Sequence, residues 1–373
     1  MGMRVALVHD WLLTYRGGEK VLEGLCEIFP EADLYTLIYK PGSTSPIIEN
    51  RKIVTSFLQS IPGIYRRYRH SLPLMPYAIQ KFDLSSYDLV ISSSHCVAKG
   101  IYLGNKKTTS KKPLHICYCH TPMRYIWDQY EDYFGPLHSS LLTRAAAGRI
   151  RKQLQAWDKK TADHVNYFIA NSENVKDRIR RFYGRDAEVI YPPVDLDFYG
   201  FEPENSSDSP WGYYLIVTTF VPYKKTELAV QTFNRLKLPL KIIGTGPEER
   251  MLRRTAGPFV EFLGWQPDEI IRWHYGRAKA LLFPGEEDFG IVPVEAQAAG
   301  CPVIAYGKGG ALETVREGKS GLFFNQQTPE ALEEAVRRFQ TTGFDRREIR
   351  NGVLRFHKKE FARQIRRFVQ SHH

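Results

Sequence analysis

Two acidic residues, Glu287 and Glu295, flank a segment whose pattern could bind a phosphorylated sugar. The apolar run 280–283 reads as a strand, residues 286–292 as a loop, and Pro293 as the first residue of a helix. Backbone amides at a helix start attract anions such as phosphate, and carboxylates accept hydrogen bonds from sugar or ribose hydroxyls. The segment therefore predicts a site for a sugar joined to a phosphate. An ordinary α/β loop with solvated acids is the alternative interpretation.

A histidine, His120, follows the apolar run 114–119, which reads as a buried strand. Ligands of α/β proteins bind outside the carboxyl ends of parallel strands, so His120 is a candidate for the functional site. Together with His115, Cys117 and Cys119 it could also resemble a metal site. Cysteines commonly fill buried strands, and no second half with zinc-like spacing occurs, so we expect no bound metal.

The glycine pair Gly17-Gly18 follows the first predicted strand, 4–9, and leads into a predicted helix over 19–28. Glycine permits close approach of the backbone to a ligand, so this turn could contact a phosphate. A plain turn is the alternative.

The chain carries a formal net charge of +11, which favours polyanionic partners such as nucleic acid, anionic lipid or phosphorylated substrates. Residues 64–70 alternate arginines with aromatic residues, and the apolar stretch 72–77 follows. Such a segment could bind nucleic acid, lie on an anionic membrane surface, or form a solvated basic face. The same ambiguity applies to a second basic stretch, formed by Arg144, Arg149, Arg151, Lys152, Lys159 and Lys160.

Composition indicates a globular protein, with 43% hydrophobic and 25% charged residues in 373. The five cysteines are few and odd in number, which favours reduced thiols in the cytoplasm. No apolar run reaches the roughly 18 residues of a membrane-spanning helix, and no secretory leader is recognised, so we expect a cytoplasmic protein.

Strand-like and helical segments alternate in both halves, which predicts an α/β fold of two doubly wound domains. The expected domains are 1–194, with a final helix at about 356–373 packing back on it, and 195–355. Pro192-Pro193 and the polar stretch 202–210 mark the linker. Within it, Asp195-Leu-Asp197 is interpreted as turn and capping chemistry. The expected strands are 4–9, 34–39, 87–91, 114–119, 167–170 and 187–191, then 213–218, 240–243, 260–263, 280–283, 303–305 and 322–324.

Six short motifs in a fixed order resemble the retaining glycosyltransferases of family 4, which have the GT-B fold. They are Gly17-Gly18, His120-Thr-Pro, Tyr191-Pro-Pro-Val-Asp195, Val221-Pro-Tyr-Lys224, Gly244-Thr-Gly-Pro247 and Glu287-Asp-Phe-Gly-Ile-Val-Pro-Val-Glu295. The resemblance covers almost the whole chain and implies two Rossmann-like domains facing each other across a cleft. Three segments look more narrowly like the O-antigen mannosyltransferases, namely 8–11, 120–127 and 286–290.

The resemblance also implies roles for individual residues. Glu295 would hold the ribose hydroxyls of a nucleotide, Glu287 the hydroxyls of the transferred sugar, and His120 would lie near that sugar as a catalytic residue. The remaining residues implied to bind the nucleotide sugar are Gly17, Gly18, Lys224, Asp288, Phe289, Gly290, Ile291 and Val292. Family members carry an arginine where this chain has Thr219, so one cation for the diphosphate is missing. Its replacement could come from Lys225, Arg124 or Arg16.

The expected function is a retaining glycosyltransferase that moves mannose from GDP-mannose to a lipid-linked saccharide in cell-surface polysaccharide synthesis. Amides and Lys224 would stabilise the leaving diphosphate, so neither a metal nor another cofactor is expected. The acceptor would bring the protein to the inner face of the cytoplasmic membrane as a peripheral protein. The alternatives are a sugar-nucleotide epimerase, a phosphorylase and, from a different class, a nucleic-acid-binding protein.

Overall fold

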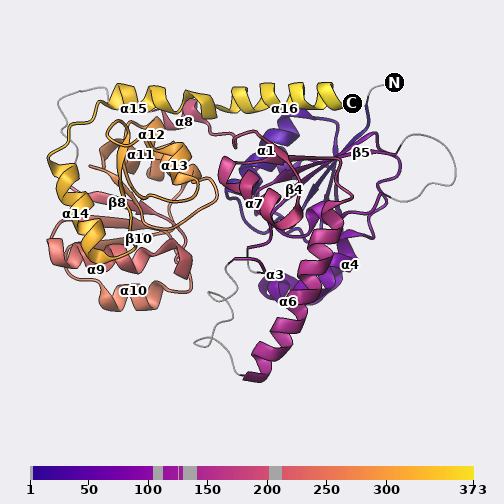
Figure 1. Ribbon diagram of the computed structural model, residues 1–373, viewed down its shortest axis with the longest axis horizontal. Coiled ribbons are helices and arrows are strands. Elements are labelled where there is room, and N and C mark those ends of the chain that lie inside the picture. The colour runs from indigo at the N-terminus through magenta and orange to yellow at the C-terminus, as the bar shows by residue number, and fades with distance from the viewer. Residues whose placement is uncertain (1–2, 104–111, 125, 129–140, 201–211) are drawn as a thin grey trace. The chain divides into compact units, whose positions relative to one another are not determined.

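Two sheets of parallel strands organise the part of the chain that the computed structural model describes, residues 3–103, 112–124, 126–128, 141–200 and 212–373 (Figure 1). Of residues 141–147 only the backbone is described. The chain divides into unit 1, Met1–Pro193 with Phe361–His373, and unit 2, Val194–Glu360. Each unit holds one sheet, which confirms the expected α/β class. The expected division after residue 194 differs from the observed one by one residue, and the predicted linker 202–210 lies outside the described residues.

The sheet of unit 1 has the strand order β3-β2-β1-β4-β5-β6-β7, with every pair parallel. Its strands are β1 Val5–His9, β2 Asp33–Thr36, β3 Ile53–Thr55, β4 Leu89–Ser94, β5 Leu114–Cys119, β6 Tyr167–Ala170 and β7 Ala187–Val189. The central strands β1 and β4 are buried along their whole length, as expected for a parallel sheet covered on both faces. Strand β3 was not predicted, because this short edge strand is only half-buried and lacks a long apolar run.

Helices cover this sheet and fill the connections between its strands. They are α1 Gly17–Ile28, α2 Pro46–Glu49, α3 Ile64–Arg67, α4 Met75–Ile79, α6 Leu141–Ala162, α7 Glu173–Tyr183 and α16 Lys358–His372. Helix α16 lies along α1 (Figure 1) and buries Phe361, Ile365, Phe368 and Val369 in the same core as Leu22 and Leu25 of α1. This spacing is one apolar stripe of an amphipathic helix, and it explains why the C-terminal end of the chain belongs to unit 1.

The sheet of unit 2 has the order β10-β9-β8-β11-β12-β13, again with parallel pairs. Its strands are β8 Tyr214–Val217, β9 Leu240–Ile243, β10 Val260–Gly264, β11 Leu281–Phe283, β12 Val303–Tyr306 and β13 Gly321–Phe324. Its helices are α8 Leu196–Tyr199, α9 Thr226–Leu236, α10 Glu249–Thr255, α11 Asp268–Arg277, α12 Ile291–Ala298, α13 Ala311–Thr314, α14 Pro329–Gln340 and α15 Arg346–Gly352. Strand β11 lies between β8 and β12, so the loops that follow these three strands meet at one sheet edge.

One local expectation was wrong and one was confirmed. Helix α12 begins at Ile291 and not at Pro293, with Gly290 as its N-cap in a backbone conformation (φ 86°) that glycine adopts without steric cost. A 3₁₀ turn at Leu354–Phe356 separates α15 from α16, and α16 lies within the range expected for the final helix, about 356–373. Asp195 caps α8 by accepting a hydrogen bond from the Phe198 amide (3.0 Å), as the capping interpretation predicted.

Candidate functional site

The carboxyl edge of the sheet in unit 1 gathers polar side chains from three neighbouring strands. His9 ends β1, Ser93 lies near the end of β4, and His120 follows β5. His9 and Ser93 are fully buried and His120 is half-buried. A buried hydroxyl or imidazole in such a place needs hydrogen-bond partners, and these three residues supply them to one another.

Ser93 links the two histidines through its hydroxyl. Its Oγ lies 3.1 Å from Nδ1 of His9 and 2.8 Å from Nε2 of His120. The backbone of His120 is held as well, because its amide donates to the carbonyl of Ser94 (2.8 Å) and its carbonyl accepts from Nδ2 of Asn171 (3.0 Å). His120 thus has a fixed ring position.

The glycine pair at the start of α1 lies against these histidines. A Cβ atom on Gly18 would lie 3.8 Å from Cε1 of His9 and 3.9 Å from Nε2 of His120. The next residue, Glu19, is buried, and its Oε1 lies 3.9 Å from Nε2 of His9. Two predicted site elements, Gly17-Gly18 and His120, therefore lie together in unit 1.

A fourth polar group, Asp10, shapes the same edge. Its carboxylate accepts the backbone amides of residues 95–98 at 2.7 to 2.9 Å and lies 3.1 Å from Nδ1 of His95. Asp10 therefore holds the turn after β4, and with it the His95 ring, which lies 6.4 Å from the His120 ring between centroids.

Burial and the neighbouring imidazoles favour the neutral forms of His120 and His95. Desolvation, with the nearby His95 and His9, lowers the pKa of His120 well below its ordinary value. Desolvation also lowers the pKa of His95, although Asp10 opposes the shift. Desolvation alone would raise the pKa of Glu19, but its interaction with His9 outweighs burial and the pKa is lowered. A neutral His120 has one ring nitrogen that donates a hydrogen bond and one that accepts a hydrogen bond.

The two candidate cations of unit 1 lie close to this cluster in sequence. Arg16 is exposed, and its amide donates to Oε2 of Glu19 (2.9 Å) at the start of α1. Arg124 is half-buried in the turn after His120. Tyr125, part of the motif that resembles the mannosyltransferases, lies outside the described residues.

In unit 2 the predicted carboxylate loop connects β11 with α12. Glu287 is partly buried and forms an ion pair with Nζ of Lys224, which comes from the turn after β8. A Cβ atom on Gly285 would lie 2.9 Å from Cα of Lys224, so a glycine is required for the loop and the turn to approach this closely. The structure thus brings together two residues 63 positions apart that the sequence analysis assigned to one site.

The start of α12 completes this half of the site. Ile291 and Val292 are the first two residues of the helix, so their amides have no partner inside it, and both are half-buried. The side chains of Asp288 and Phe289 precede the helix, and Phe289 is buried with its ring 5.3 Å from that of Phe356. Lys224 and the positive end of the α12 dipole provide a region suited to an anion.

Glu295, the second carboxylate, lies on α12 and is buried. Its Oε2 accepts a hydrogen bond from the hydroxyl of Tyr275 (3.3 Å) in α11. Burial, followed by the charge of Glu295, raises the pKa of Tyr275 well above its ordinary value, so the tyrosine stays a hydrogen-bond donor.

The position where a family arginine was expected, Thr219, lies in the turn between β8 and the 3₁₀ helix Pro222–Lys224. Lys225 follows that helix with a left-handed backbone (φ 53°) and an exposed side chain. On the other side of the carboxylate loop, Lys308 follows β12 and is exposed. Its pKa is raised by the Tyr306 hydroxyl and, more weakly, by Glu286. Lys308 was not among the site residues predicted from the sequence.

Sequence reasoning missed His9, Ser93, Glu19, Asp10 and His95. The rule that selected His120, a polar residue at a strand end, applies equally to His9 and Ser93 and could have found them. Gly310 was also missed; its amide donates a hydrogen bond to the carbonyl of Glu287 (2.8 Å). Only the strand order β1-β4-β5 and β8-β11-β12 shows that these positions are neighbours.

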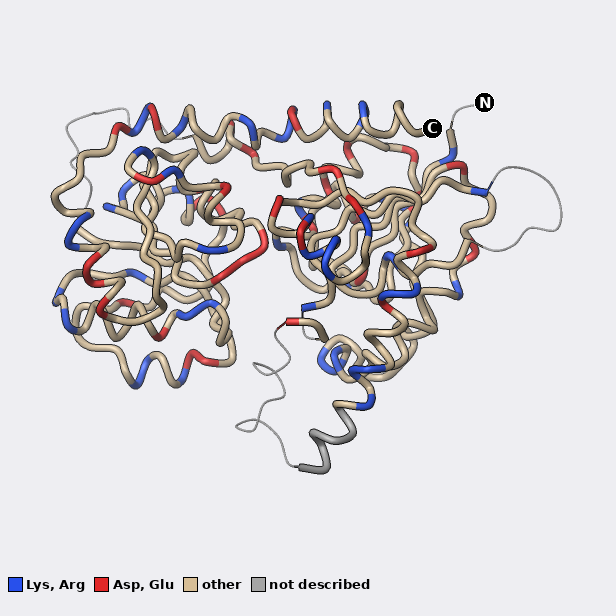
Figure 2. The backbone as a smooth tube through the Cα atoms, in the orientation of Figure 1, with Lys and Arg blue, Asp and Glu red and all other residues tan. Residues whose placement is uncertain are grey.

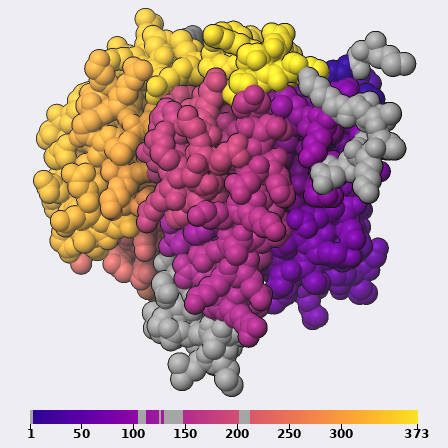
Figure 3. Space-filling model, turned by 45° about the vertical axis from the view of Figure 1, so that its right-hand side comes forward, coloured from indigo at the N-terminus to yellow at the C-terminus, as the bar shows by residue number. Residues whose placement is uncertain are grey.

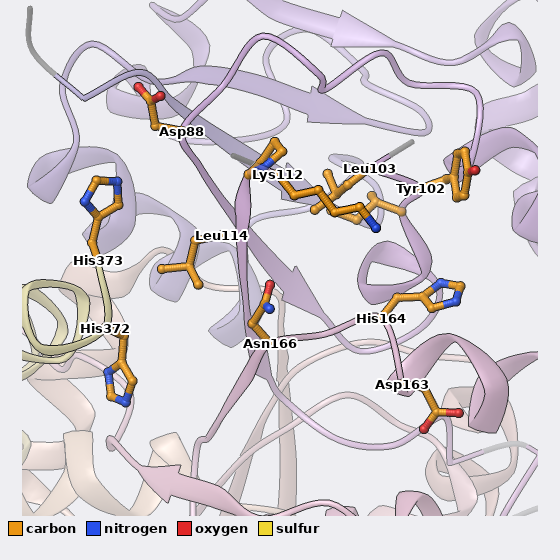
Figure 4. Close-up of a pocket in the computed structure, with 12 residues that line it drawn as sticks. Asp88, Tyr102, Leu103, Lys112, Leu114, Asp163, His164, Asn166, His372 and His373 are labelled. Carbon is orange, nitrogen blue, oxygen red and sulfur yellow. The ribbon is translucent and has the colours of Figure 1, made fainter. Parts of the chain in front are cut away.

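A pocket of about 620 Å³ lies at the opposite edge of the unit 1 sheet, where Asp88, Leu114 and Asn166 stand at or just before the strand starts (Figure 4). His372 and His373 border it on one side, and Tyr102 and His164 on the other. Leu103 and Lys112 in its wall adjoin residues 104–111, which lie outside the described part. It is thus separate from the cluster around His120.

The arginine- and aromatic-rich segment of unit 1 folds into short helices, and we call its exposed residues the basic–aromatic face. Ile64, Met75 and Ile79 are buried and anchor it. The exposed residues of this face are Phe57, Ile61, Tyr65, Arg66, Arg67, Arg69, Leu74 and Tyr77. Figure 2 shows Lys and Arg along this segment and along α6, which lies beside it at the surface in Figures 1 and 3. No described helix has both the length and the apolarity needed to cross a membrane.

Comparison with protein-family models gives two matches that follow one another along the chain. Residues 15–198 match the model described as Glycosyltransferase Family 4, and residues 202–353 match Glycosyl transferases group 1.

Two curated relatives and one solved structure illustrate the similarity. A D-inositol 3-phosphate glycosyltransferase of Nocardioides sp. is 25% identical over 233 residues, covering 53% of this chain and 51% of the relative. A GDP-mannose-dependent alpha-(1-6)-phosphatidylinositol monomannoside mannosyltransferase of Mycobacterium tuberculosis is 28% identical over 205 residues, covering 48% and 53%. The chain thus spans about half the length of the curated relatives it matches. The structure of Anabaena HepE in complex with UDP and glucose has a TM-score of 0.70 at 16% identity, covering 99% of this chain and 100% of HepE, which shows the shared fold.

Proposed function

The chain belongs to the GT-B glycosyltransferases of family 4, and from this premise we propose that it is a retaining hexosyltransferase that uses a nucleotide sugar. The observation that carries this proposal is the Lys224–Glu287 ion pair beside the start of α12. It combines a cation, amides with no partner inside the helix and a carboxylate, which are the groups that a sugar bonded to a diphosphate requires.

In the proposed reaction, unit 2 binds the donor. Lys224 and the amides of Ile291 and Val292 stabilise the negative charge that develops on the leaving diphosphate. Glu287 accepts hydrogen bonds from hydroxyls of the sugar, and Glu295 from those of the ribose. A preorganised amide or lysine aimed at a developing charge contributes roughly 10²- to 10³-fold to the rate, so these groups can supply much of the catalysis without a resident metal.

The stereochemical course that we propose is retention by attack on the same face. The bond between the anomeric carbon and the diphosphate oxygen breaks, and the acceptor oxygen forms the new bond on the face that the diphosphate leaves. The departing phosphate oxygen takes the proton of the acceptor hydroxyl. His120 of unit 1 contacts a sugar hydroxyl in this scheme.

We favour mannose from GDP-mannose as the donor and a lipid-linked saccharide as the acceptor. Support comes from the M. tuberculosis relative, whose name gives both GDP-mannose and a phosphatidylinositol mannoside. The basic–aromatic face adds support, because exposed apolar groups beside arginines suit an anionic membrane carrying the acceptor. On this proposal the protein is peripheral on the inner face of the cytoplasmic membrane and acts in cell-surface polysaccharide synthesis.

Thermal unfolding in the presence of individual nucleotide sugars tests the donor proposal. A ligand at 100 times its Kd adds about 2.7 kcal/mol to the free energy of unfolding, and GDP-mannose should raise Tm more than UDP-glucose or ADP-glucose. Incubation of the same protein with labelled GDP-mannose and a membrane extract should label a lipid fraction. Release of free sugar without an acceptor would indicate an epimerase or hydrolase instead, and no stabilisation by any nucleotide sugar would refute the proposal.

A further inference from the structure

Ser93 occupies a position from which it can control the chemistry of His120. It is fully buried near the end of β4, and the strand register pairs it with His9 on β1 and with Tyr118 on β5. Its hydroxyl is within hydrogen-bond distance of both rings, 3.1 Å from Nδ1 of His9 and 2.8 Å from Nε2 of His120. No role is implied for this serine by the family motifs described above.

A hydroxyl group carries only one proton. Ser93 can therefore donate a hydrogen bond to only one of the two rings, and it must accept a hydrogen bond from an N–H of the other ring if both bonds are made. Whether Nδ1 of His9 carries a proton then determines whether Nε2 of His120 carries one. A neutral imidazole has a single N–H. Once the protonation of Nε2 is fixed, so is whether Nδ1 of His120 donates or accepts a hydrogen bond.

Glu19 sets the direction of the hydrogen bonds between His9, Ser93 and His120. Its carboxylate lies 3.9 Å from Nε2 of His9 and favours a proton on that nitrogen. When the His9 ring carries one proton, its Nδ1 is an acceptor, so Ser93 donates to His9 and accepts from Nε2–H of His120. Nδ1 of His120 is then the ring nitrogen with a lone pair for a ligand hydroxyl.

From these contacts we propose that Ser93 is a positioning residue, which fixes the tautomer and ring orientation of His120 through its hydrogen bonds to His9 and His120. The proposal rests on the proposed transferase function, because it gives His120 the task of accepting a hydrogen bond from a sugar hydroxyl. Ser93 itself does not touch the substrate in this scheme.

The adjacent serine provides a matched control. Oγ of Ser92 lies 2.8 Å from Nε2 of His115, and both residues are fully buried. Successive strand residues face opposite sides of a sheet, so Ser92→Ala removes an equivalent buried serine–histidine hydrogen bond away from His120. It reports what the loss of such a bond does to stability alone.

The direct test is the ¹⁵N spectrum of the imidazole nitrogens, recorded without substrate on protein labelled at histidine, with His120 assigned through His120→Gln. The parent protein should show one tautomer at His120. Ser93→Ala should move both His120 nitrogen shifts toward the average of two tautomers, and Ser92→Ala should leave them in place. Unchanged His120 shifts in Ser93→Ala, or equal changes in both variants, would overturn the proposal. If Ser93→Ala does not fold, Ser93→Cys keeps the side-chain size with a much weaker donor and gives the same comparison.

Kinetics supply the second measurement. A misplaced ring should lower kcat by about 10- to 100-fold in Ser93→Ala while KM for the nucleotide sugar stays within about twofold. Ser93→Thr, which retains the hydroxyl, should recover part of kcat. A rise in KM with unchanged kcat would contradict the positioning role. Because the spectra need no activity, absence of transfer in the parent protein would refute the proposed function and leave the tautomer result to decide this inference.

Discussion

The backbone amide of Gly310 donates a hydrogen bond to the carbonyl oxygen of Glu287 at 2.8 Å, so the loop after β12 holds the carboxylate loop in place. A Cβ atom on Gly310 would lie 2.3 Å from Cα of Phe289, a distance that the packed backbone cannot accommodate without moving. The position of Glu287 therefore depends on a glycine that carries no functional group.

Gly310→Ala should consequently displace the carboxylate loop. Overpacking of this kind costs about 1–3 kcal/mol, and the displaced Glu287 should weaken binding of the nucleotide sugar. Chemical denaturation and calorimetric titration measure the two effects. Gly343→Ala is the control, because a Cβ atom there meets nothing within 4 Å. Parent-like affinity in Gly310→Ala would show that the loop does not bind the donor.

Glu287→Gln should preserve the fold and reduce transfer by at least about 100-fold. The substitution keeps the shape of the side chain and removes the charge that pairs with Lys224. The pair is partly exposed, so its loss should change the free energy of unfolding by no more than about 1 kcal/mol. Steady-state transfer rates and thermal unfolding separate the two effects. Glu286, the neighbouring residue, is exposed, so Glu286→Gln should behave like the parent protein. Equal losses of transfer activity in both variants would argue against a specific role of Glu287.

Lys224→Ala should weaken the binding of a nucleoside diphosphate more than it weakens folding. A charge-assisted hydrogen bond to phosphate contributes about 1.5–3 kcal/mol, which corresponds to a rise in Kd of roughly 10- to 150-fold. Titration of GDP at several salt concentrations should also show a smaller salt dependence than in the parent protein. Lys319→Ala removes an exposed lysine elsewhere in unit 2 and serves as the control.

A pH-dependent loss of stability should arise from His115. Burial, together with the charge of Lys99, lowers its pKa to about 3, whereas the unfolded chain has the ordinary value near 6.5. Below pH 6.5 the unfolded state therefore binds more protons, and stability falls as the pH falls toward 3. Between pH 6.5 and 5.0 this one group should cost about 2 kcal/mol. His115→Gln should flatten the dependence of the unfolding free energy on pH over this interval, and an unchanged slope would contradict the assignment.

The sequence predicted strands best where an apolar run has sharp ends. The predicted bounds of β5, β6 and β9 are those observed, because polar residues, glycine or proline border these buried segments. The starts of helices were predicted less accurately. At α12 Pro293 suggested the first helical residue, whereas the helix begins two residues earlier, at Ile291, with Gly290 as its N-cap.

The candidate site could be predicted only in part, for a different reason. Lys224, Glu287 and His120 stand in motifs, whereas the contact of Ser93 with His9 spans 84 positions and exists only because β1 and β4 are adjacent. Strand order is a property of the whole sheet, and local patterns do not contain it. Gly310 was missed likewise, since its role appears only when the loops after β11 and β12 meet.

The basic–aromatic face should bind anionic membranes. Its exposed side chains include Leu74 and Tyr77, which are 49% and 56% accessible, and the charged Arg66 and Arg67. Each buried methylene contributes about 0.8 kcal/mol, and each arginine near an anionic surface about 1 kcal/mol, so a few such groups suffice for reversible binding. We expect co-sedimentation with vesicles containing phosphatidylglycerol and little with vesicles of phosphatidylcholine alone.

Three double variants distinguish the contribution of this face from that of the overall positive charge. Arg66→Glu with Arg67→Glu should lower vesicle binding at least about 10-fold, since it removes two attractions and adds two repulsions at the membrane surface. Arg366→Glu with Arg367→Glu makes the same charge change at two exposed neighbours on α16 and should have a small effect. Leu74→Ser with Tyr77→Ser should weaken binding even at high salt, where electrostatic attraction is screened. Equal losses in the two arginine variants would mean that net charge alone drives the binding, and the face would then have no specific part in it.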